Sequence, residues 1–215
     1  MILKVEQICK ELFSAHFRIL HLDEVVGTVE VQGSIASMEA GIRIQLFGDE
    51  YYLKYAGGIL KTSTIPERKI KIYRPYRICE DFKEQSGSVY QVEKKDGWFK
   101  ITNFYELVFC GVTYHLYPMA IGKEGGKHSI YCGDEQIGQI NKASEVCDDL
   151  HHYDIYAVNQ QAAVLAVLFS LYSYVNVFYK PGEKVSKSYA RYMSVTTNKA
   201  LKEKYNPDFE GSIQP

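Results

Sequence analysis

The sequence lacks the patterns that mark several classes of protein. Its five cysteines are scattered, odd in number and free of any CxxC pair, which argues against a disulfide framework and favours reduced thiols in a cytoplasm. Charges at Lys4, Glu6, Lys10 and Glu11 interrupt residues 1–13, so this segment has no apolar core of the signal-peptide kind. The net charge of −1 provides no global field that would recruit nucleic acid or an anionic membrane. We therefore expect a cytoplasmic protein that binds no nucleic acid and contacts a membrane only peripherally.

Signatures of enzymes and of metal sites are also missing. The chain has no G-x-S-x-G motif, and Gly122 and Gly126 enclose three residues where a phosphate loop requires four. No nucleophile can be placed beside a base, which favours a non-enzymatic protein without a cofactor. The stretch 145–154 holds metal-capable side chains in neither a zinc nor an EF-hand spacing. We expect a solvated acidic loop there, and no metal.

One long apolar run dominates what the sequence does contain. Residues 162–179 carry no charge and are apolar on every side, interrupted only by Ser170, Ser173 and Asn176. Asn159 fits an N-cap and Pro181 with Gly182 fits a helix stop, so we predict a helix over residues 160–179. Its length falls just short of the ~20 apolar residues that span a bilayer, which favours a buried core helix over a transmembrane one.

The remainder reads mostly as antiparallel strands. From residue 16 onward, short runs alternate apolar and polar residues and are separated by turn residues, as in successive hairpins. Residues 1–15 fit an amphipathic helix, with a strand as the alternative for the first half. The polar residues 79–88 are the candidate boundary between two halves. Residues 181–215 form a polar tail that we expect to be weakly ordered or partly helical.

A short motif occurs twice in this strand-rich region. Its pattern is I-x3-D-E-x-[VI]-G-x-[VI], and equivalent positions are 111 residues apart. The first copy is Ile19, Asp23, Glu24, Val26, Gly27 and Val29, and the second is Ile130, Asp134, Glu135, Ile137, Gly138 and Ile140. Asp-Glu predicts a turn, and the glycine predicts a bulge, a bend or a close backbone approach in the returning strand. Two similar antiparallel halves favour a closed barrel, because closure removes sheet edges.

The order of many antiparallel strands followed by one apolar helix resembles the tubby C-terminal-like superfamily. This superfamily includes tubby-like, phospholipid-scramblase-like and LURP-one-related proteins. The resemblance rests on the D-E-x-[VI]-G hairpins at 23–29 and 134–140, the strand 154–158 and the helix 162–179, and it covers residues 16–180. It implies a closed barrel of about twelve strands around a central helix. A helix that fills the lumen leaves no cavity inside, so we expect activity on the outer surface, the rims or the tail.

The resemblance also implies a class of ligand. Tubby-like members bind phosphoinositides through basic residues. The cysteine run and the acidic calcium-binding segment of scramblase-like members have no counterpart here, which argues against lipid scrambling.

A basic segment offers the candidate site for such a ligand. Between residues 61 and 77, six basic residues stand against the single acidic residue Glu67. These residues are Lys61, Arg68, Lys69, Lys71, Arg74 and Arg77. They predict a non-enzymatic module that binds a phosphoinositide or another anionic headgroup on an outer strand, or else a solvated strand face. The alternatives are a structural or protein-interaction protein that uses its tail, and an enzyme with its site at a barrel rim.

Overall fold

The fold of the protein is mainly β, as predicted. The computed structural model describes residues 1–33, 40–56, 70–80, 85–96, 100–122, 125–183, 189–191, 194–195 and 198–214. The strands of this part are β1 (Ile2–Lys10), β2 (Ser14–His21), β3 (Glu24–Gly33), β4 (Ala40–Leu46), β5 (Asp49–Tyr55), β6 (Ile70–Glu80), β7 (Gln85–Asp96), β8 (Lys100–Phe109), β9 (Val112–Gly122), β10 (Gly126–Cys132), β11 (Glu135–Lys142), β12 (Glu145–Cys147), β13 (His152–Ala157), β14 (Tyr189–Arg191) and β15 (Ser194–Val195). Its helices are α1 (Gln160–Val177), α2 (Lys199–Lys202) and α3 (Phe209–Ser212).

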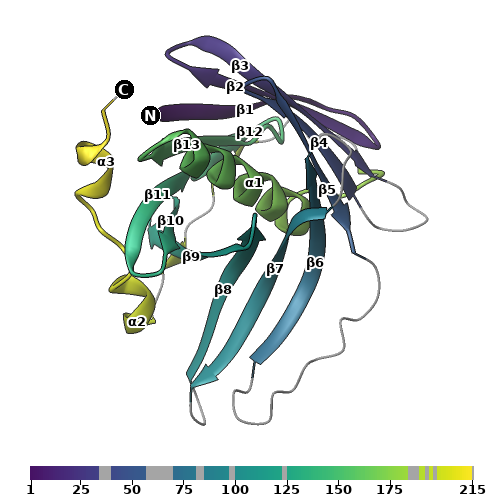
Figure 1. Ribbon diagram of the computed structural model, residues 1–215. Coiled ribbons are helices and arrows are strands. Elements are labelled where there is room, and N and C mark those ends of the chain that lie inside the picture. Colours follow the sequence, from purple (N-terminus) through teal and green to yellow (C-terminus); the bar gives the residue numbers. More distant parts are fainter. Residues whose placement is uncertain are drawn as a thin grey trace.

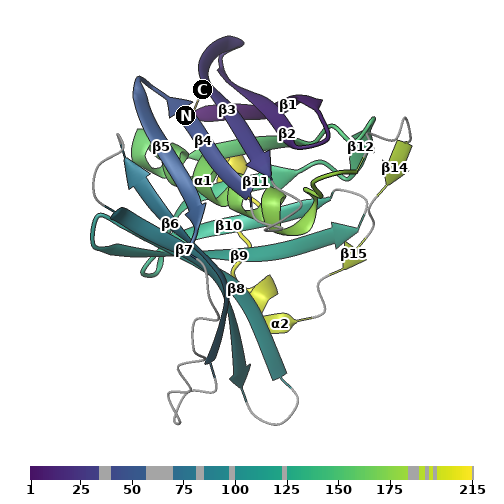
Figure 2. The ribbon, with the colours of Figure 1, turned by 90° about the vertical axis from the view of Figure 1, so that its right-hand side faces the viewer.

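Twelve of these strands close into one antiparallel barrel (Figures 1 and 2). Their order around the ring is β10-β11-β13-β1-β2-β3-β4-β5-β6-β7-β8-β9. The ring closes because β9 pairs with β8 and also with β10. The short strand β15 extends the pairing of β9, and β12 with β14 forms a separate ribbon. The prediction of a closed antiparallel barrel is confirmed.

Helix α1 is the core around which the barrel closes. Both views show strands on opposite sides of it (Figures 1 and 2). Every residue from Ala162 to Tyr172 is buried, whereas a surface helix exposes a polar face at each turn. The side chain of Asn159 accepts a hydrogen bond from the N–H of Ala162 at 2.9 Å, which confirms the predicted N-cap. Within the described ranges, α1 is the one helix long and apolar enough to cross a membrane, and 67% of it is buried.

The two copies of the I-x3-D-E-x-[VI]-G motif fold alike. Ile19 pairs with Gly27 and Ile130 pairs with Gly138, and a register shift follows at the same place in each hairpin. The predicted bulge is therefore present in both copies. The same 111-residue offset relates β1, β2, β3 and β4 to β9, β10, β11 and β13. Each pairing of β11 with β13 repeats a pairing of β3 with β4, so the barrel contains two equivalent four-stranded units.

The N-terminal segment is a strand, and its helical interpretation is wrong. Leu3 and Val5 are buried at alternate positions of β1, which pairs with β13 on one side and β2 on the other. Apolar residues three and four apart in residues 2–13 fit a helix, but several of them also fit alternate positions of a strand. Residues 2–10 form a strand because β13 and β2 on either side supply hydrogen-bond partners for their backbone N–H and C=O groups.

Strand β6 contains a proline. Pro75 lies within the strand, where the register of its pairing with β7 shifts between Tyr73 and Tyr76. The missing N–H of proline is tolerated there because a bulge leaves that position unpaired. Arg74, next to it, has a φ of 47°. The C-terminal part of the basic segment therefore lies on an irregular part of β6.

Residues 79–88 do not separate two halves. Glu80 ends β6 and Gln85 begins β7, and these strands pair with each other within the continuous ring. The residues at both ends of the predicted polar connection are therefore strand.

The C-terminal tail lies against the outside of the barrel (Figure 1). Glu210 of α3 accepts from the Lys127 ammonium at 2.7 Å, and the N-terminal ammonium of Met1 donates to the carbonyl of Gln214 at 3.0 Å. Helix α2 falls within residues 197–205, where the sequence predicts helix. The described part of the tail is thus partly helical and held by polar contacts.

The glycine of the first motif copy is predicted to be sterically required. A Cβ atom added at Gly27 would lie 2.4 Å from the carbonyl oxygen of Gln45, so Gly27→Ala must displace backbone. We expect a loss of about 1–3 kcal/mol in the free energy of unfolding, measured by urea denaturation. Gly41→Ala is the matched control, because a Cβ at Gly41 meets nothing within 4 Å. Equal stability of the two variants would contradict the close-approach explanation.

Candidate functional site

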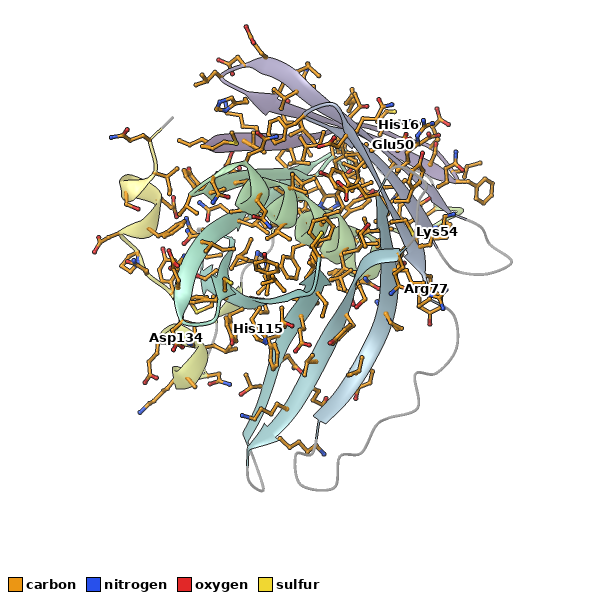
Figure 3. The ribbon with its side chains drawn as sticks, in the orientation of Figure 1. His16, Glu50, Lys54, Arg77, His115 and Asp134 are labelled. Carbon is orange, nitrogen blue, oxygen red and sulfur yellow. The ribbon has the colours of Figure 1, made fainter. Side chains whose placement is uncertain are left out.

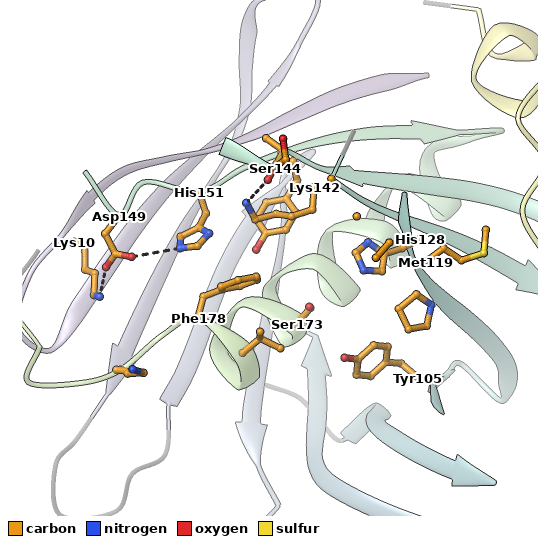
Figure 4. A pocket seen from close by; sticks show the side chains of 18 of the residues that line it. Lys10, Tyr105, Met119, His128, Lys142, Ser144, Asp149, His151, Ser173 and Phe178 are labelled. Atoms are coloured by element: carbon orange, nitrogen blue, oxygen red, sulfur yellow. Dashed lines mark hydrogen bonds and ion pairs between the residues drawn. The ribbon is translucent and has the colours of Figure 1, made fainter. Parts of the chain in front are cut away.

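A pocket of about 690 Å³ lies beside the C-terminal half of α1 (Figure 4). Strands β9, β10, β11 and β13 line it with Met119, His128, Lys142 and Tyr153, and α1 contributes Val177. This corrects the expectation that the helix leaves no cavity inside the barrel. The side chains of α1 do not fill the ring at this end, and polar side chains from β10, β11 and β13 converge on the remaining space.

Lys142 is the most unusual of these polar groups. Residue Lys142 is only 6% exposed, and its ammonium donates to the carbonyl of Ala143 at 3.1 Å. The Nζ atom lies 5.3 Å from the ring centroid of Tyr153 and 5.4 Å from that of Phe178. No carboxylate of the described residues lies within ion-pair distance of it. Burial lowers the pKa of Lys142 to about 8, because nothing charged compensates for the lost water.

Two histidines flank this lysine (Figure 4). His151 is 1% exposed, and burial, with a further contribution from the charge of Lys142, lowers its pKa to about 4. Burial and the Lys142 charge likewise lower the pKa of His128 to about 4. Both imidazoles are therefore neutral at pH 7 and offer one donor and one acceptor nitrogen each. The Nδ1 atom of His151 and the hydroxyl of Tyr153 are buried without a hydrogen-bond partner among the described residues.

A polar chain holds His151 in place. Asp149 forms an ion pair with the buried ammonium of Lys10, and its other oxygen lies 3.5 Å from Nε2 of His151. The backbone N–H of His151 donates to the side chain of Gln7 at 3.1 Å, and Gln7 in turn donates to the hydroxyl of Tyr174 at 3.1 Å. The prediction of a solvated acidic loop is wrong for His151, which is 1% exposed, whereas the side chain of Asp149 is 29% exposed and lines the pocket. Among the described residues, no cluster of three metal-ligating side chains is present.

The repeat provides an internal comparison for this site. Three pocket residues occupy inward positions whose equivalents in the first copy are apolar and buried, and the pairing registers align them at the 111-residue offset. The pairs are Phe17 and His128, Val31 and Lys142, and Ile42 and Tyr153. The barrel therefore folds with apolar residues at these positions. Fold stability does not explain the polar residues of the second copy, since burying polar groups without full pairing costs free energy.

The basic segment is only partly described. Lys61, Arg68 and Lys69 lie outside the described residues, and the side chain of Lys71 does as well. Arg74 donates from Nη1 to the carbonyl of Asn176, in the last turn of α1. Arg77 is exposed and pairs across the strands with Lys54 (Figure 3). The two arginines with described side chains therefore have different environments: Arg74 is bonded to the end of α1, and Arg77 is exposed to solvent.

Comparison with protein-family models, with curated proteins and with solved structures gives no match for this chain. The resemblance to tubby-like proteins therefore remains a prediction. The functional residues that sequence reasoning missed are Lys10, His128, Lys142 and Tyr153. The sequence does contain a signal for His128, Lys142 and Tyr153. If the 111-residue repeat is extended to the strands beside the motif, these three polar residues align with apolar residues of the first copy.

Removing the charge of Lys142 is predicted to stabilise the ligand-free protein. Lys142→Met replaces an uncompensated buried ammonium by an apolar chain of similar length, and we expect a gain of about 1–2 kcal/mol in the free energy of unfolding at pH 7. Lys10→Met is the matched control. It leaves Asp149 without its partner, so we expect a loss of about 1–3 kcal/mol. Urea denaturation of both variants measures the difference, and losses of similar size would contradict the account.

Proposed function

We propose that this protein is a non-enzymatic binding module whose ligand carries an anionic headgroup and binds in the pocket beside Lys142. The observation that carries the proposal is a buried ammonium with no carboxylate partner among the described residues, at a position where the first copy of the repeat has Val31. An anionic group from a ligand would supply the missing counter-charge. Charge-assisted hydrogen bonds of this kind are among the stronger polar interactions in proteins.

The surroundings of Lys142 suit the rest of such a ligand. Met119, Val177 and Phe178 give the pocket apolar walls, which fit a hydrocarbon portion. The hydroxyl of Tyr153 and Nδ1 of His151 are available to the headgroup as further hydrogen-bonding groups. The expected ligand is therefore an amphipathic anion, of which a lipid with a phosphate headgroup is one example.

This proposal keeps the ligand class expected from the sequence and moves its site. The outer basic segment remains a prediction, since Arg77 is its one member with a described side chain that is not bonded to α1. A protein-interaction role for the tail also remains a prediction. The described parts of the tail make contacts to the barrel, such as Glu210 to Lys127, and no partner surface stands out among them.

The proposal predicts a binding profile with 1-decanesulfonate, a probe that stays ionised across the pH range. Isothermal titration calorimetry should show binding to wild type, about tenfold or more weakened in Lys142→Met, because a charged hydrogen bond is lost. Affinity should fall as pH rises through about 8, where the ligand-free Lys142 loses its proton.

Two controls make this measurement decisive. Decyltrimethylammonium has the same chain and the opposite charge and should not bind. Arg77→Met removes a basic residue of the outer strand and should leave the affinity for decanesulfonate unchanged. Weakened binding in Arg77→Met together with unchanged binding in Lys142→Met would contradict the pocket and favour the outer strand. Co-sedimentation of the same variants with phosphoinositide vesicles applies that comparison to a lipid headgroup.

A further inference from the structure

We infer that Lys142 is also a carbonyl-reactive amine, which condenses reversibly with aldehydes or ketones that enter the pocket to form an imine. This activity goes beyond the binding of anions and does not depend on it. Anion binding uses the ammonium form of Lys142, whereas imine formation uses the neutral amine.

Lys142 differs from Lys10 and Lys127, two other lysines of the described residues whose side chains are largely withdrawn from solvent. The side chain of Lys10 is 3% exposed and paired with Asp149, and that of Lys127 is 12% exposed and paired with Glu210. Each of these two ammonium groups therefore has a carboxylate partner. Lys142 is buried to a similar degree, yet its contacts are one backbone carbonyl and two aromatic rings. The neutral form of the Lys142 amine is therefore easier to reach than that of a lysine in water.

The pocket gives the amine of Lys142 both space for a reactant and increased reactivity. Lys142 lines a cavity large enough for a small carbonyl compound, so its amine is enclosed but reachable. The lowered pKa of about 8 leaves roughly a tenth of the amine neutral at pH 7, far more than for a surface lysine. Desolvated lysines of this kind act as nucleophiles towards carbonyl carbons.

Imine formation also requires proton transfers, and two histidines line the pocket. The neutral amine nitrogen attacks the carbonyl carbon, the C=O π electrons move to oxygen, and one N–H proton of the ammonium so formed is transferred to that oxygen, which gives a carbinolamine. A second proton is delivered to the hydroxyl, the C–O bond breaks as the nitrogen lone pair forms the C=N bond, and water leaves. The iminium then gives up its remaining N–H proton in place of the one delivered, so the amine and the carbonyl compound give an imine and water. His128 lines the same pocket as Lys142, and the charge of Lys142 contributes to lowering the pKa of His128, so its imidazole is near enough to take part in these proton transfers. His151 lines the same pocket.

The test is reductive trapping with benzaldehyde, an uncharged probe, and sodium cyanoborohydride on the full chain. Peptide mapping by mass spectrometry then measures the rate of labelling at each lysine. We expect Lys142 to be labelled about tenfold or more faster than Lys10, Lys127 and the exposed Lys54 at pH 7, because of its larger neutral fraction. Its rate should level off above about pH 8, where the amine of Lys142 becomes fully neutral.

Wild type alone decides the inference, so a variant that fails to fold does not obscure the result. Labelling spread over exposed lysines, with Lys142 no faster than Lys54, would overturn it. His128→Phe, which restores the residue found in the first copy, should slow the labelling of Lys142 and leave that of Lys54 unchanged. Because benzaldehyde carries no charge, failure of decanesulfonate to bind would count against the proposed function only, and failure of labelling would count against this inference only.

Discussion

The burial of α1 is the constraint on which the rest of the structure depends. A helix whose residues are buried from Ala162 to Tyr172 requires apolar partners in every direction, and one sheet face cannot supply them. A closed ring of strands does so, and closure also removes the unpaired edges of a large antiparallel sheet. The ring and the helix are further joined by polar contacts at the end of α1. There the hydroxyl of Tyr172 donates to the carbonyl of Arg74 at 2.9 Å, and the guanidinium of Arg74 returns a bond to Asn176.

The pocket arises where this packing is incomplete. Along the first four-stranded unit, Phe17, Val31 and Ile42 complete the core, and Phe17 packs edge-to-face on Tyr174 with ring centroids 4.9 Å apart. The equivalent positions of the second unit carry a histidine, a lysine and a tyrosine instead. Proteins commonly depart from optimal core packing where a site requires it, at a cost in stability. The same buried lysine accounts for both proposals, since it attracts an anion when charged and a carbonyl carbon when neutral.

Much of the fold follows from the sequence because its signals are local. The uncharged run after Asn159 identifies α1, and the motif at Ile19 to Val29 identifies both the hairpin and its bulge. The strand character of β1 could not be predicted with the same ease, because the apolar spacing of residues 2–13 fits both periods and the partner strands lie far away in sequence. The pocket was missed for a related reason. Polar residues in an alternating strand are ordinarily assigned to the outer face, and only the register against the first unit places Lys142 inward.

The account therefore depends on the charge state of one side chain, and the titration of Lys142 tests it most directly. Nuclear magnetic resonance of protein with ¹³C-labelled lysine ε-carbons, with Lys142→Met to assign the signal, gives the pKa of this amine. The account predicts a midpoint of about 8 in the ligand-free protein and a higher one when decanesulfonate is bound, since a bound anion stabilises the ammonium form. A midpoint near the ordinary value of 10.5, unchanged by the probe, would show that Lys142 is solvated or already paired and would contradict the account.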